Sequence, residues 1–165
     1  MGNVSTGAKA GAAAGVVFGV ISAVLTYATL VAQKSTIISD IAKSLPASSP
    51  ITADQAYNIA LYAGSGIAVI VGVIIGVILG AIYGALFNRL PGRTDLTKAL
   101  ALGIIFWILD GMLLGLGNLS YGGVYYAEHV VETLMLALVF SYLLAVFYKR
   151  FSPPAEVPTQ TTPKM

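Results

Sequence analysis

The chain has 165 residues, of which 57% are hydrophobic and only 10% are charged, and its mean hydropathy is +0.85. An average soluble domain is about one quarter charged, so this chain lacks the polar surface of a soluble or disordered protein. A net charge of +2 excludes a basic nucleic-acid-binding face, and the absence of cysteine excludes disulfides and thiolate-ligated metals. What remains is a small integral membrane protein.

Charge-free stretches locate the membrane spans, because a span needs about 20 apolar residues and a charge at its centre costs about 2.5–3.5 kcal/mol. The first stretch, between Lys9 and Lys34, has 24 residues, and the second, between Asp54 and Arg89, has 34. A third is interrupted only by Asp110. The sequence predicts an all-α, four-helix transmembrane bundle forming one domain over residues 1–150. Its spans are expected at 10–32, 56–88, 96–117 and 125–148.

Capping signals predict where two of these helices begin and end. The segment Thr52-Ala53-Asp54-Gln55 has the spacing of a capping box, so the second helix should begin at Ala53. Thr94 or Asp95 can cap the third helix, and Gly117-Asn118 can end it.

Two segments outside the spans have a distinct composition. The outer loop from Gln33 to Pro50 spaces apolar residues at helical intervals, which predicts a short amphipathic surface helix, acting as an anchor or as a lid or partner site. The Pro- and Thr-rich segment 151–165 is predicted to be a disordered cytoplasmic tail. The apolar positions of the surface helix are Ile37, Ile38, Ile41 and Leu45.

Small residues recur every four positions along the first two spans. Lipid tails give helices no hydrophobic drive to associate, so such strips serve close van der Waals packing of backbones. The pattern is compatible both with glycine-zipper packing inside one chain and with packing between subunits. The helix-packing candidates are Gly11, Gly15, Gly19, Gly72, Gly76, Gly80, Gly84 and Gly103.

Aromatic residues gather at the predicted ends of the last span. Phe147, Tyr148 and Phe151 predict an inner interfacial belt. Polar residues are concentrated in the outer half of the spans, so we expect a polar vestibule that glycine-packed apolar helices close on the cytoplasmic side.

Four ionisable residues, Asp110, Glu128, His129 and Glu132, lie in or at the edge of the last two spans. Asp110 and Glu132 each lie roughly 10 Å from the outer ends of neighbouring antiparallel helices. Intramembrane acids are candidates for functional sites, and two adjacent carboxylates in a low dielectric share a proton. The four residues therefore form a candidate proton- or cation-binding site.

The same residues also have a structural interpretation. Asp110 would bond a hydroxyl group on another helix, and Glu128 and His129 would be hydrated at the interface. A single histidine without a second Glu-x-x-His element gives little basis for a metal or haem site. Whether the chain binds a metal ion is left open, and no cofactor is expected.

The stretch from Tyr83 to Arg93 (YGALFNRLPGR), followed by Leu100 to Trp107 (LALGIIFW), resembles small uncharacterised prokaryotic membrane proteins. Those proteins join two glycine-rich spans through a Pro-Gly cytoplasmic turn. The resemblance implies a four-helix integral membrane protein from a bacterium or an archaeon, and it implies no activity.

Three functions fit these observations. The leading prediction is a non-enzymatic accessory subunit of a larger membrane complex, or a self-associating scaffold, with the lipid bilayer as its surroundings and no nucleic acid partner. The alternative is a small proton- or cation-linked transporter or channel that uses Asp110, Glu132 and His129. The third is a metal or redox subunit of a membrane complex.

The distribution of Lys and Arg predicts that both termini are cytoplasmic in the cell membrane. With the N-terminus inside, inner segments hold seven of these residues and outer segments hold Lys34 and Lys43 alone. Reporter fusions after Met165 and within 47–49 should therefore report opposite sides of the membrane. Activity of both fusions on one side would contradict this topology.

Overall fold

The computed structural model describes residues 2–46 and 48–152, and within these residues the chain forms helices and no strand. Four helices are long and apolar enough to cross a membrane, which confirms the predicted all-α bundle and makes the chain a small multi-pass membrane protein. Most of the predicted disordered tail lies outside the described residues. The helices are α1 (Val4–Ala32), α2 (Lys34–Ser44), α3 (Ala53–Leu86), α4 (Asp95–Trp107) and α5 (Gly123–Phe151).

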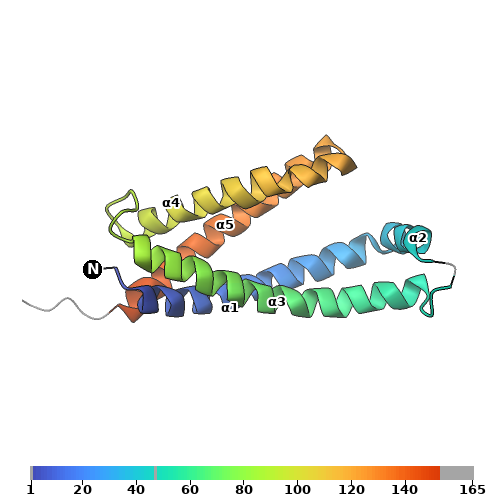
Figure 1. Cartoon of the computed structure of the whole chain (residues 1–165), viewed down its shortest axis with the longest axis horizontal. Helices are drawn as coiled ribbons and strands as arrows, with labels where there is room; N and C mark the ends of the chain where they lie inside the picture. The colour runs from blue at the N-terminus through green and yellow to red at the C-terminus, as the bar shows by residue number, and fades with distance from the viewer. Residues whose placement is uncertain (1, 47, 153–165) are drawn as a thin grey trace, which may run out of the picture.

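The long helices form two hairpins that meet at one end of the molecule and diverge toward the other (Figure 1). One hairpin pairs α1 with α3, and the other pairs α4 with α5, while α1 also contacts α5. We call the end where α1 begins and α5 finishes the closed end. The opposite end, where α2 lies, is the open end. The bundle is therefore splayed rather than parallel.

Glycine residues bring the backbones of α1 and α3 into direct contact. A Cβ atom added to Gly11 would lie 2.7 Å from the Cα of Gly80, and one added to Gly76 would lie 2.7 Å from the Cα of Gly15. Real Cβ atoms essentially never approach other atoms within 3.0 Å, so these sites have no room for a side chain. The two strips thus face each other within one chain. Gly7, Gly19, Gly72 and Gly84 are equally crowded by the opposite helix.

The apolar core lies at the closed end, and each long helix contributes to it. From α1 it takes Ala10 and Ala14, and from α5 it takes residues between Phe140 and Tyr148. Members of the core on α3 and α4 are likewise those nearest the turn that joins these helices. Side-chain packing therefore holds the hairpins together over only part of their length.

An aromatic cluster anchors this core. Tyr83 meets Tyr148 edge-on with 4.9 Å between ring centroids, and Phe87 stacks on Tyr148 at 5.0 Å. The Tyr83 hydroxyl donates to the Asp95 carbonyl at 2.7 Å, and the Asn3 N–H donates to the Tyr148 hydroxyl at 3.2 Å. Tyr148 is 3% exposed, so it belongs to the core and not to the predicted interfacial belt.

Local capping explains where three helices begin. Thr52 and Gln55 form both bonds of a capping box, which confirms that α3 begins at Ala53. Thr94 caps α4 in the same way. Asn3 accepts hydrogen bonds from the N–H groups at the start of α1, which lets this helix begin at Val4, before the predicted span.

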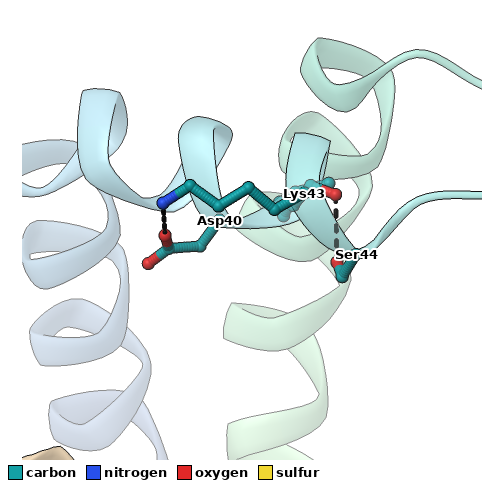
Figure 2. A network of polar contacts seen from close by, with 4 residues as sticks. Asp40, Lys43 and Ser44 are labelled. Carbon is teal, nitrogen blue, oxygen red and sulfur yellow. Dashed lines mark hydrogen bonds and ion pairs between the residues drawn. The ribbon is translucent and has the colours of Figure 1, made fainter.

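The amphipathic helix predicted in the first loop is confirmed as α2, which packs against α3 at the open end. Its three isoleucines, and Leu45 directly after its last residue, are half-buried, while its polar residues are exposed. Lys43 Nζ lies 2.9 Å from Asp40 Oδ1, and the Ser44 hydroxyl donates to the Ile41 carbonyl; both contacts are drawn as dashed lines in Figure 2. Because both charged side chains are more than half exposed, this ion pair contributes little to stability.

The α1–α3 contact predicts opposite effects for one substitution at two glycines of α3. Gly64→Ala should leave stability unchanged or raise it by up to about 1 kcal/mol, because alanine favours the helix and nothing lies within 4 Å of the added Cβ. Gly76→Ala should lower the free energy of unfolding by about 1–3 kcal/mol through overpacking against Gly15. Denaturation in mixed micelles, followed by circular dichroism, measures both. Equal effects would mean that α1 and α3 are not in backbone contact.

Candidate functional site

The third span leaves α-helical geometry at Ile108, two residues before Asp110. After Trp107 the chain forms a π-helix, η1 (Ile108–Leu113), and then a 3₁₀-helix, η2 (Leu114–Tyr121). The chain stays helical through Gly117, where the end of this span was expected, but the second half of the span is not α-helical. π-helical turns are rare and frequently mark functional sites, and this one contains the acid of the span interior.

Side chains from both hairpin partners hold η1 against α5. Trp107 donates its indole N–H to the Val130 carbonyl at 2.9 Å, and the Tyr126 hydroxyl donates to the Met112 carbonyl at 3.2 Å. Gly111 leaves room for the Thr133 hydroxyl, which an added Cβ atom would meet. These contacts set Asp110 and Thr133 at the same height in the hairpin.

Asp110 is half-buried and lines a cavity together with Trp107 and Thr133. This cavity has a volume of about 80 Å³, and it extends from Asp110 into the closed-end core, with which it shares Leu79, Leu102 and Phe140 among its lining residues. The carboxylate of Asp110 has no hydrogen-bond or ion-pair partner among the described residues. It therefore faces the cavity with its acceptor oxygens unused.

The other predicted residues have different surroundings. His129 is half-buried against Gly115, where an added Cβ atom would lie 2.7 Å from the His129 Cδ2. Glu128 and Glu132 are exposed on α5 and line a shallow depression with Val131. The imidazole thus lies at the η2 contact, while the two glutamates lie on the outer surface of the hairpin.

Asp110 and Glu132 lie at the same height along the α4–α5 hairpin but on different surfaces of it. Glu132 immediately precedes Thr133, which lies beside Gly111, yet it is exposed while Asp110 lines the cavity. No hydrogen bond joins the two carboxyl groups in the described part of the chain. Proton sharing between them stays a prediction. Within residues 2–46 and 48–152, no group of three His, Asp or Glu side chains is arranged to hold a metal ion.

Two parts of this site are missed by pattern reading. The cavity and the π-helix depend on how α4 meets α5, which no local motif encodes. The available signals were Gly111, directly after Asp110, and Thr133, directly after Glu132. A small residue and a hydroxyl residue beside two intramembrane acids indicate close helix contact at that height.

Comparison of the chain with known protein families, with curated proteins and with solved structures gives no match. Function is therefore inferred from the placement of these side chains in membrane helices.

Loss of the indole hydrogen bond should loosen η1. Trp107→Phe keeps an aromatic ring but removes the bond to the Val130 carbonyl, so unfolding should become easier by about 0.5–1.5 kcal/mol. The matched control is Phe106→Leu on the same helix, which removes no hydrogen bond. Hydrogen exchange of the amides in 108–113 should accelerate in Trp107→Phe alone. Unchanged exchange would show that the indole bond does not hold η1 in place.

Proposed function

We propose that this protein is a non-enzymatic accessory subunit that binds another membrane protein through the acidic face of α5. The acidic face comprises Glu128, Val131, Glu132 and Met135, all of which are exposed in the isolated chain. One observation carries the proposal, namely that two carboxylates stand on the outer surface of a membrane-spanning helix.

The depth of these carboxylates gives the proposal its energetic basis. Measured along α5 from Lys149 at 1.5 Å per residue, Glu132 is ~26 Å away and Glu128 is ~32 Å away. The hydrocarbon core is about 30 Å thick. If Lys149 marks its inner edge, Glu132 lies just inside the outer edge and Glu128 lies at the outer edge. A charge at the centre of a span costs about 2.5–3.5 kcal/mol, and less toward the edge. A partner that supplies hydrogen-bond donors or cations removes this cost.

The chemistry of the acidic face favours a different protein over a second copy. Two copies joined through this face would bring four carboxyl groups together, and like charges repel in a low dielectric. The glycine strips do not offer an alternative route to self-association, because α1 and α3 already cover each other's strips. The expected partner is a membrane helix that carries Lys, Arg or hydroxyl groups in the same half of the bilayer.

The proposed location is the cell membrane, with both termini cytoplasmic. The seven-to-two distribution of Lys and Arg supports this orientation. The closed end is then the cytoplasmic end, and the acidic face lies in the outer half of the membrane.

Site-specific photo-crosslinking in native membranes tests the proposal. A photoreactive residue in place of Val131 should form an adduct with another membrane protein, and Glu128→Gln with Glu132→Gln should reduce that adduct at least about fivefold by removing the charges that attract the partner. A photoreactive residue in place of Ile74, which is 54% exposed on α3, serves as the control position.

The outcomes separate the two forms of the leading prediction. Adducts of the chain with itself alone would identify a self-associating scaffold and contradict the accessory role. Adducts from position 131 that survive the double substitution would show that the carboxylates do not recruit the partner.

A further inference from the structure

The residues that line the cavity beside Asp110 extend along two neighbouring helices. Its lining on α4 and η1 extends from Ala99 to Asp110, and its lining on α5 extends from Thr133 to Leu144. On α5 the twelve residues from Thr133 to Leu144 are separated by eleven steps, which correspond to ~16 Å at 1.5 Å per residue. The cavity's volume of about 80 Å³ is about half that of the compact cavity of roughly 150 Å³ that admits benzene. The cavity is partly open, so an alkyl chain that lies along its lining would be only partly enclosed by protein.

The walls of the cavity are apolar away from Asp110. Phe18 reaches it from α1, Leu79 from α3, and Phe140 and Leu144 from α5. Both hairpins therefore enclose the cavity, although they diverge just beyond it. An alkyl chain in this position would bury its surface against protein on several sides while its end stays near Asp110.

The polar side chains that line the cavity have acceptor atoms available to a ligand, but their donor groups are already hydrogen-bonded. Thr133 donates its hydroxyl proton to the His129 carbonyl at 2.7 Å, and Ser141 donates to the Ala137 carbonyl at 2.7 Å. The Trp107 indole N–H is already bonded to the Val130 carbonyl. What the cavity offers to a ligand is the carboxylate of Asp110 together with hydroxyl lone pairs. A complementary head group must donate hydrogen bonds, and a cation does so best beside a carboxylate.

We propose that the cavity binds a single-chain aliphatic amine, with its ammonium group on Asp110 and its alkyl chain directed toward Leu144. The ammonium would neutralise a carboxylate that otherwise faces an apolar environment alone, where charge is costly. A fatty acid would place a second anion beside Asp110, and so would the phosphate of a phospholipid head group. This inference is independent of the proposed partner, because it concerns a different surface of α5.

Trp107 supplies a direct readout, because it is the one tryptophan of the chain and it lines the cavity. The probe is decylamine brominated at its third carbon, which places the bromine near the head group and therefore near Trp107, added to the full-length protein in phosphatidylcholine nanodiscs. It should quench Trp107 fluorescence saturably, whereas the matched brominated decanoate should give only the linear quenching of bilayer partitioning. Butylamine should compete poorly, because it lacks the chain.

Two variants with the same chemical change locate the head group. Asp110→Asn should weaken saturable binding of the amine by about tenfold or more, as expected for the loss of a partly buried ion pair. Asp95→Asn, at the start of α4 and outside the cavity, should leave binding unchanged. Equal affinities for the amine in the wild type and Asp110→Asn would overturn the proposal.

Two further measurements on the wild-type protein test the proposal if Asp110→Asn does not fold. In the wild-type protein the amine must bind at least about tenfold more tightly than decanoate, and equal binding of the two would overturn the assignment of the ammonium to Asp110. Phosphatidylethanolamine in the nanodisc should not displace the amine. Displacement would identify a phospholipid head group as the occupant and would overturn the single-chain assignment.

Discussion

The backbone contact between α1 and α3 is the constraint on which the rest of the molecule depends. Glycine opposite glycine lets the two helices touch without ordering any side chain, so the contact gains dispersion and Cα–H···O interactions at no cost in rotamer entropy. The two helices of this hairpin consequently lie very close together, and each glycine strip is covered by the other helix. Large side chains such as Tyr83 and Leu79 are left to project toward the other hairpin, and they form the closed-end core.

The second hairpin is held by different means, and this difference produces the splay. Aromatic packing and hydrogen bonds at Tyr148 join it to α1 and α3 over the closed end only. Farther along, Trp107 and Tyr126 bond across to the backbone within the hairpin itself. The hairpins therefore separate where the core ends, and the cavity lined by Asp110 extends from the core toward the point of separation. Two acids at one height thus acquire opposite surroundings, with Asp110 enclosed and Glu132 outside.

Local patterns predicted much of this architecture because their physical cause is local. The spans follow from hydropathy, the start of α3 from the Thr52 capping box, and α2 from the spacing of Ile37 and Ile41. What the patterns did not predict depends on which helix faces meet. Tyr148 has the composition of an interfacial anchor, yet it is buried because α1, α3 and α5 converge on it. The predicted closure by glycine-packed helices likewise misses the aromatic cluster that joins the hairpins. η1 is held by contacts with residues of α5 that lie 14 or more positions away in sequence.

The order of the helices along the chain has a consequence for biosynthesis. α1 ends at Ala32, and the helix that covers its glycine strip ends 54 residues later at Leu86. At a translation rate of about 5–20 residues per second, this corresponds to a delay of roughly 3–11 s. During that interval the strip of α1 meets lipid or the insertion machinery, with no partner from its own chain. The α1–α3 hairpin is then complete before α4 and α5 emerge, so the closed end, which begins with the first residues of α1, is completed only when the last residues of α5 emerge.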